Sequence, residues 1–352
     1  MKVDYIVVGL GLAGLAFVEE LSAAKKTFVV FEDDSQTSSL VAGGVYNPVI
    51  LKRFTPVWNA QEQLKVALPF YKSIEEKLNI IIDEKFVIKK AFKSIEDQNT
   101  WFEACDKPKL IEYLSPKLDC QPYKGVIADF NFGDVNGTGR IDTKKLVESY
   151  RSYLEDSQLI RFENFEHQQI NLDEELVQYK DIKASRIVFC EGFGIKENPY
   201  FKNLPLNEAK GELITIHAPE LHIDFLLKST VFVLPLGDHL YKVGATFNWT
   251  DKTSDPSEEG KAELVEKLKK VINVPYTIVS QSAGIRPTVA GRRPLVGLHP
   301  KHRQLVVLNG LGTRGVMIAP TVAKNLFNHL EKGEALDSEI DIKRFIGIVA
   351  SS

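Results

Sequence analysis

The order of apolar and polar positions predicts a strand, a helix and a second strand at the start of the chain. Residues 5–8 form an apolar, largely β-branched run, which is typical of a parallel strand buried on both faces. A helical pattern continues through Leu21, and residues 28–31 form a second apolar run. This order predicts a strand–helix–strand unit whose two strands pair in parallel.

The same patterns predict alternating elements along the rest of the chain. Helical spacing occurs over residues 58–78, 100–105, 144–154, 258–271 and 316–330. Strand-like runs occupy residues 80–92, 159–165, 176–179, 186–190, 213–247 and 305–308. Asp142 is the expected N-cap of the helix at 144–154.

These elements predict an α/β fold, α+β overall. We expect a Rossmann-type domain that is discontinuous in sequence, carrying a second domain that is β-rich and antiparallel. The expected boundaries are 1–80 plus 140–205 plus 284–352 for the first domain and 81–139 plus 206–283 for the second.

Three glycines lie between the first strand and the first helix, in the sequence Gly-Leu-Gly-Leu-Ala-Gly. Gly9 allows a tight turn, Gly11 lets the backbone approach a pyrophosphate, and Gly14 lets the helix lie close to the sheet. Glu32 ends the second strand, where a carboxylate accepts hydrogen bonds from ribose hydroxyls. Together these features predict a dinucleotide site without choosing FAD over NAD. The residues expected to contact the nucleotide are Gly9, Gly11, Leu12, Ala13, Gly14 and Glu32.

Composition narrows the class of protein. A chain of 352 residues exceeds the ~100 to 200 of one domain, which favours two joined domains. A net charge of -3 gives no bulk attraction to nucleic acid or anionic lipid, so nucleic-acid binding is not expected. Three scattered cysteines and histidines without ligand spacing argue against a disulfide framework and a metal site. With no leader pattern and no apolar run of membrane-spanning length, we expect a soluble, cytoplasmic protein.

Four segments carry a family resemblance. They are the glycine unit, the small-residue segment 38–48, the strand end Cys190-Glu191-Gly192, and a C-terminal group made of residues 284–287, 292–297 and 309–320. Together they resemble the D-amino-acid oxidase superfamily of FAD-dependent oxidoreductases, in the branch of glycine oxidase, sarcosine oxidase and the oxidase domain of a bifunctional tRNA-modifying enzyme. The resemblance implies FAD in the first domain and substrate in the second.

The resemblance also implies which residues lie against FAD. Besides the glycine unit, they are Ser38, Ser39, Gly43, Gly44, Val45, Gly192, Arg286, Gly310, Gly312, Thr313, Arg314, Gly315 and Val316. In relatives the loop at 310–315 and the helix after it direct backbone N–H groups at the flavin, where they stabilise negative charge. Some sarcosine oxidases hold flavin through a C-terminal cysteine, and no cysteine follows Cys190, so we expect non-covalent FAD.

Arg286 is the residue that the resemblance assigns to the substrate carboxylate, which its planar guanidinium can pair bidentately. Tyr46 and Tyr241 are candidates for contact with the substrate, or are core tyrosines with satisfied hydroxyls. Lys242 is a candidate for assisting oxygen reduction, or a solvated lysine. Lys52 and Arg53 are candidates for a basic rim, or surface residues.

The leading hypothesis is an FAD-dependent amine or amino-acid oxidase or dehydrogenase. It would oxidise a C–N bond of a small substrate by hydride transfer to flavin N5, and the imine product would hydrolyse. The electron acceptor is O2 or unknown. One alternative is oxidative removal of a carboxymethyl group from a modified tRNA base, and another is a flavin-binding protein without catalysis.

Overall fold

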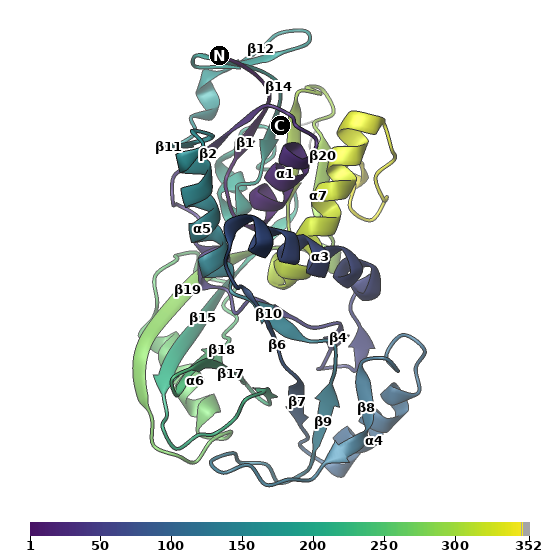
Figure 1. The fold of residues 1–352 in the computed structure, drawn as a ribbon, viewed down its shortest axis with the longest axis vertical. Coiled ribbons are helices and arrows are strands. Elements are labelled where there is room, and N and C mark those ends of the chain that lie inside the picture. Colours follow the sequence, from purple (N-terminus) through teal and green to yellow (C-terminus); the bar gives the residue numbers. More distant parts are fainter. Residues whose placement is uncertain (346, 348–352) are drawn as a thin grey trace.

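The computed structural model describes residues 1–345 and 347. Two eight-stranded sheets form its framework, one above the other in Figure 1. The upper sheet carries the N-terminal strand and packs against the C-terminal helix α7 (Gly315–Lys332). This arrangement confirms the expected mixed α/β fold with a β-rich second half.

The parallel part of the upper sheet has the strand order β11-β2-β1-β14-β21. Its strands are β1 (Lys2–Val8), β2 (Phe28–Glu32), β11 (Ile160–Phe162), β14 (Ile182–Phe189) and β21 (Leu305–Asn309). The antiparallel strands β12 (Ile170–Leu172), β13 (Val177–Tyr179) and β20 (Leu295–Leu298) extend it. Because both faces of the central strands are covered, their inner segments, residues 5–8, 28–31 and 187–189, are apolar and buried.

Helices cover one face of this sheet and form the larger hydrophobic core with it. They are α1 (Leu12–Ala23), α3 (Ala60–Leu78), α5 (Thr143–Asp156) and α7. The expected cap of α5 is confirmed, since the Asp142 carboxylate accepts a hydrogen bond from the Lys145 N–H at 3.1 Å. An aromatic core lies on the other face of the sheet.

The lower sheet has the strand order β19-β15-β18-β17-β16-β7-β9-β8. In chain order its strands are β7 (Ile88–Ala91), β8 (Leu114–Asp119), β9 (Phe132–Val135), β15 (Leu206–His217), β16 (Leu226–Lys228), β17 (Phe232–Gly237), β18 (Leu240–Gly244) and β19 (Thr277–Val289). All neighbours are antiparallel except β16 and β7, which pair in parallel. The helices α4 (Ile95–Cys105) and α6 (Glu258–Leu268) pack against this half.

Short elements complete the chain. A small sheet joins β3 (Val45–Tyr46), β10 (Gly139–Ile141) and β6 (Asp83–Lys85), and a hairpin joins β4 (Val49–Ile50) to β5 (Thr55–Pro56). Helical turns occur at α2 (Ser38–Val41), η1 (His167–Gln169), η2 (Gly192–Glu197), η3 (Ala290–Arg292), η4 (Gly312–Arg314) and η5 (Ile342–Phe345). None of the helices in the described residues is both long and apolar enough for a bilayer crossing.

The long pair β15 and β19 runs along one side of the molecule and links the two halves (Figure 1). Strand β19 continues without a break through residue 284, where the sequence placed a domain boundary. The domain division stays a prediction.

Candidate active site

A cavity of about 1150 Å³ is lined by residues from both large sheets. Its walls come from the carboxyl ends of β1, β2 and β14 and from one face of the lower sheet. The predicted cofactor-contacting residues that line it are Gly9, Gly11, Leu12, Ala13, Glu32, Ser38, Ser39, Gly43, Gly44, Val45, Gly192, Arg286, Gly312, Thr313, Arg314, Gly315 and Val316. Segments far apart in sequence therefore meet at one site.

The turn between β1 and α1 leaves no room for side chains. Gly9 has a φ of 91°, and a Cβ there would lie 2.7 Å from the Cys190 carbonyl oxygen. A Cβ on Gly14 would lie 2.0 Å from the Gly9 carbonyl oxygen, so α1 begins directly against the turn. The first turn of α1 faces the cavity, where its N–H groups and positive dipole end favour an anion.

Glu32 is buried at the end of β2 and is held by several donors. Its carboxylate accepts hydrogen bonds from the backbone N–H groups of Leu10 at 2.5 Å and Asp34 at 3.1 Å. Arg151 of α5 forms an ion pair with it at 3.0 Å. Burial raises the pKa of the Glu32 carboxyl above its ordinary value, while these donors act in the opposite direction. The acid is therefore fixed in place at the cavity wall.

Two further loops close the site. Gly44 has a φ of 66°, and a Cβ there would lie 1.9 Å from the Ile141 carbonyl oxygen, so this backbone must be free of side chains. On the other side, the Asn309 amide donates to the Gly192 carbonyl at 2.8 Å and its oxygen accepts from the Gly310 N–H at 2.7 Å. This arrangement ties β21 to the end of β14 and presents the start of α7 to the cavity.

Arg286 projects from β19 across Gly211 of β15 into the cavity. Its Nη1 donates to the Thr246 carbonyl at 3.2 Å, and its Cζ lies 4.4 Å from the centroid of the Phe247 ring. Among the described residues no carboxylate pairs with it, and burial alone lowers the pKa of its guanidinium to about 10. The side chain is therefore a charged, largely desolvated cation at neutral pH with free donors, which suits a carboxylate.

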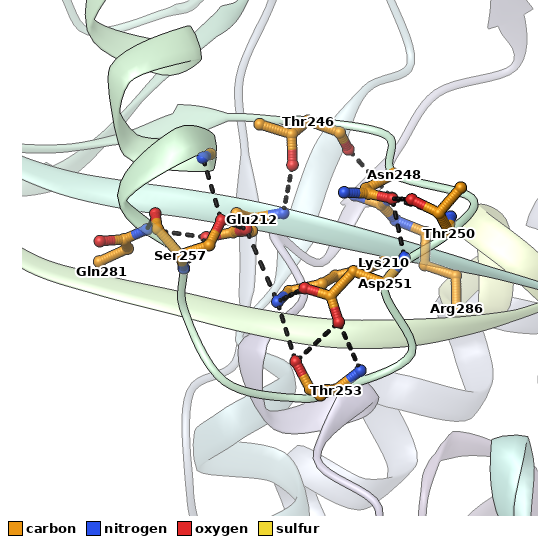
Figure 2. A network of polar contacts seen from close by, with 11 residues as sticks. Lys210, Glu212, Thr246, Asn248, Thr250, Asp251, Thr253, Ser257, Gln281 and Arg286 are labelled. Atoms are coloured by element: carbon orange, nitrogen blue, oxygen red, sulfur yellow. Dashed lines mark hydrogen bonds and ion pairs between the residues drawn. The ribbon is translucent and has the colours of Figure 1, made fainter.

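A polar network on the opposite face of β15 fixes the loop that contacts Arg286 (Figure 2). Lys210 is 1% exposed and its ammonium donates to Asp251 at 2.5 Å. Glu212 is 2% exposed and accepts from the Ser257 hydroxyl at 2.6 Å and from the Gln281 amide at 2.7 Å. These contacts hold the loop 246–257 at Asp251 and Ser257. The Thr246 hydroxyl, which accepts from the Glu212 N–H at 2.9 Å, holds its other end and the carbonyl that contacts Arg286.

Six predicted residues lie outside the lining, and one of them is the exposed Arg53, whereas Lys52 lines the cavity. Gly14 packs under the turn, and Gly310 packs against Val289 and Leu295. The Tyr46 hydroxyl donates to Asp83 at 2.8 Å, and the Tyr241 hydroxyl donates to the Leu221 carbonyl. Burial lowers the pKa of the Lys242 ammonium, whose charged neighbours are Arg140, Asp142 and Lys144. Contact of Tyr46, Tyr241 and Lys242 with substrate stays a prediction.

Comparison with known families decides the class of this site. The family model for FAD dependent oxidoreductases, DAO, matches residues 4–328. The chain belongs to the FAD-dependent oxidoreductase family. This membership confirms the family and the FAD expected from the sequence.

The cavity suits the cofactor of an FAD-dependent oxidoreductase. At about 1150 Å³ it exceeds the ~300 to 1,000 Å³ of an ordinary ligand pocket, which leaves room for a dinucleotide and a small substrate. The N-termini of α1 and α7 both open into it, with Glu32 at the end of β2. The turn at Gly9 would hold the pyrophosphate and Glu32 the ribose. Non-covalent attachment stays a prediction.

Relatives of this family member include oxidases of amino acids and tRNA-modifying proteins. Glycine oxidase of Bacillus subtilis (strain 168) is 24% identical over 220 residues, which are 58% of this chain and 57% of that protein. Glycine oxidase of Bacillus licheniformis is 22% identical over 92% of this chain and 91% of its own. The tRNA 5-methylaminomethyl-2-thiouridine biosynthesis bifunctional protein MnmC of Azoarcus sp. (strain BH72) is 27% identical over 46% of this chain, and the match spans 28% of that protein.

Solved structures share the fold over nearly the whole chain. Iminodiacetate oxidase from Chelativorans sp. BNC1 has a TM-score of 0.76 at 15% identity, covering 97% of this chain and 98% of that one. Glycine oxidase from Bacillus cereus ATCC 14579 has a TM-score of 0.76 at 15% identity, covering 99% and 98%. At this level of identity the agreement establishes the fold.

Sequence reasoning missed several residues of the site. Arg151 lies far from Glu32 in sequence, and the hydrophobic pattern of its helix identifies only the buried positions and not the partner of Arg151. Gly211 and Phe247 have no motif, and only the pairing of β15 with β19 shows that they flank Arg286. Lys228 lines the cavity without any local sequence feature that marks it.

Proposed function

We propose that this oxidoreductase oxidises a C–N bond of a small amine that carries a carboxylate. The observation that supports it is Arg286, a buried guanidinium that faces the cavity with no carboxylate partner among the described residues. A buried cation of this kind is stabilised when an anionic ligand completes its hydrogen bonds.

In the part of the chain that the structure describes, acidic side chains line only the upper-sheet side of the cavity, whereas basic side chains line both sides. The lining acids are Glu32, Asp33, Glu163, Glu166, Glu191 and Glu197, which belong to the upper sheet and its loops. The lining lysines and arginines are Lys52, Lys228, Lys267, Arg286, Arg292 and Arg314. None of the described residues that line the lower-sheet side is Asp, Glu or His. This side is therefore suited to an anionic substrate, and the described residues on it include no carboxylate or imidazole that could act as a general base.

The residues of the chain would act by binding and orienting the substrate. Arg286 would hold the carboxylate and so fix the neighbouring carbon, while Leu213, Leu226 and Phe232 supply apolar walls that exclude water. Bound FAD supplies the capacity to accept a hydride. Because the described residues on this side include no carboxylate or imidazole to take a proton from an ammonium, the amine would enter neutral. It loses a hydride and a proton overall, and water then adds to the imine to give a carbonyl compound and the freed amine.

The names of similar proteins support this substrate class. Two glycine oxidases and an iminodiacetate oxidase are named for amines that carry carboxylates. A second candidate is removal of a carboxymethyl group from a modified tRNA base, which the similarity to the tRNA-modifying bifunctional proteins favours. A carboxymethylamine on a base would present the same carboxylate to Arg286.

The test is anaerobic reduction of the flavin, which requires no assumption about the electron acceptor. Purified holoprotein is mixed with glycine, sarcosine, proline, D-amino acids or modified tRNA, and loss of flavin absorbance gives the reduction rate kred and the Kd. We expect a carboxylated amine to reduce it, and Arg286→Ala to lower kred/Kd at least about a hundredfold, since charge-assisted hydrogen bonds contribute ~1.5 to 3 kcal/mol each.

A matched variant controls for loss of a surface arginine. Arg303 is exposed, so Arg303→Ala should leave kred/Kd unchanged. Equal kred/Kd in wild type and Arg286→Ala contradicts the carboxylate assignment. A flavin that none of the amines reduces supports a binding protein without catalysis, and reduction by modified tRNA alone supports the second candidate.

A further inference from the structure

Lys228 lies at the end of the cavity away from Arg286. Its strand, β16, is separated from β19 by β17, β18 and β15 in the lower sheet. Lys228 lines the cavity together with Thr230 and Lys267, and we call these three residues the lysine end. The Thr230 hydroxyl donates to the Lys267 carbonyl at 3.3 Å, which joins the hairpin after β16 to helix α6.

Strand register places a second cation directly beside Lys228. In the parallel pairing of β16 with β7, Lys228 lies opposite Lys90. Like charges in that position destabilise a sheet unless something offsets them. Two contacts offset the charge of Lys90: its ammonium donates to Asp97 at 2.8 Å and to the Ala91 carbonyl at 2.7 Å.

Lys228 has no such offset within the described residues. Its charged neighbours are Lys90, Lys93 and Lys267, all cations, and the one acid beside Lys267 is Glu263, which pairs with it at 2.5 Å. Burial and these neighbours lower the pKa of the Lys228 ammonium to about 8. Ile88 and Leu226, which precede Lys90 and Lys228 by two residues in the same two strands, also line the cavity, and their apolar surface strengthens an ion pair formed beside them.

We propose that the lysine end binds a second anionic group of the substrate, a carboxylate or a phosphate, through the ammonium of Lys228. The inference rests on the proposed function, because Arg286 holds the first carboxylate. The substrate class is then an amine with an acid near its nitrogen and another acid at the far end of its N-substituent. A substrate of this class would offset a cation that the described residues leave without an anionic partner.

Sheet geometry indicates the scale of that substituent's length. Four strand spacings of about 4.8 Å put β16 about 19 Å from β19 along the sheet. Arg286 leans across Gly211, one strand closer, and both long side chains project into the cavity. The two acids are therefore separated by several bonds, and free glycine reaches only one cation.

The experiment uses pairs of N-substituted glycines in which only the terminal charge differs. Each pair has a polymethylene spacer of one to six carbons ending in a carboxylate or in the matching carboxamide, and a third series ends in a phosphonate. Anaerobic mixing with the holoprotein gives kred and Kd from the flavin spectrum. At one spacer length, we expect kred/Kd of the acid-terminated compound to exceed that of its carboxamide by about tenfold or more.

Variants then assign the preference to Lys228. Lys228→Met should bring the acid-to-amide ratio to about one, Lys228→Arg should retain part of it, and Lys202→Met, at an exposed position, should leave it unchanged. A preference for phosphonate over carboxylate would identify a phosphorylated substrate, and the reverse a dicarboxylate. Either supports the subsite.

Three outcomes overturn the subsite. One is an acid-to-amide ratio near one in the wild type at every length, even where the amines reduce the flavin. Another is that Lys228→Met lowers kred/Kd equally for the acid and the amide of a pair, which indicates a structural role for Lys228. If no compound reduces the flavin, the proposed function fails. The subsite is then judged from the Kd values given by the shift of the flavin spectrum. Equal Kd values for acids and amides are the third outcome that overturns it.

Discussion

Gly211 has no side chain at the place where Arg286 crosses β15, and this gives a sharp test of the site. A Cβ on Gly211 would lie 1.8 Å from Nη2, 2.0 Å from Cζ and 2.2 Å from Nη1 of Arg286. The backbone φ of Gly211 is outside the left-handed region, so Gly211→Ala is acceptable to the main chain. The substitution therefore acts on the guanidinium.

The size of the effect follows from the displacement. To restore ordinary contact at 3.4 Å, the nearest guanidinium atom must retreat by about 1.6 Å. That movement breaks the 3.2 Å hydrogen bond to Thr246 and the packing on Phe247. Since a misplacement of about 1 Å in a positioning group lowers rates by ~10²-fold, Gly211→Ala should lower kred/Kd for a carboxylated amine by about a hundredfold.

A double-mutant cycle isolates the mechanism. Gly211→Ala, Arg286→Ala and the double variant are compared by anaerobic flavin reduction, with flavin content as a check on the cofactor site. If Gly211→Ala acts through Arg286, adding it to Arg286→Ala should cause little further loss. Additive losses, or a Gly211→Ala protein with wild-type kred/Kd, would refute this account of the anchor.

Three further predictions concern the cofactor, the support of the anchor and the lysine end. Gly14→Val should purify without flavin absorbance, because its Cβ would lie 2.0 Å from the Gly9 carbonyl. Lys210→Met should lower the free energy of unfolding by about 3 kcal/mol in denaturant titrations, because it leaves Glu212 without its buried cation. The Kd for acid-terminated substrates should rise as pH increases through about 8, where the Lys228 ammonium loses its proton, while the Kd for the matching amides should not follow that titration.

Features encoded by neighbouring residues could be predicted from sequence. The β1-α1-β2 unit and the turn at Gly9 depend on residues within one short segment, and their spacing specifies the backbone that the structure contains. Arg286 was found through a matched motif, and the structure places it on the cavity wall. The α/β class followed because buried parallel strands and amphipathic helices have distinct periodicities.

Features that depend on strand register could not be predicted. Lys228 becomes a neighbour of Lys90 only through the parallel pairing of β16 with β7, and sequence pattern does not specify which strands pair. The candidate tyrosines show the same limit. Their types suit a substrate pocket, but the Tyr46 hydroxyl is engaged by Asp83 and the Tyr241 hydroxyl by the Leu221 carbonyl, both distant in sequence.

The alternation of side chains along β15 explains how Arg286, which has no carboxylate partner among the described residues, can be held in place. Lys210 and Glu212 point to one face of the strand, where they bind Asp251 and Ser257, and Gly211 between them opens the other face to Arg286. The charges on the first face are satisfied within the protein, so they order the loop without competing for the substrate. The guanidinium on the second face keeps donors that the carboxylate of the proposed substrate would fill. Because the two sets of charges lie on opposite faces of one strand, the protein can order the loop behind Arg286 and still leave the guanidinium without a described carboxylate partner on the cavity side.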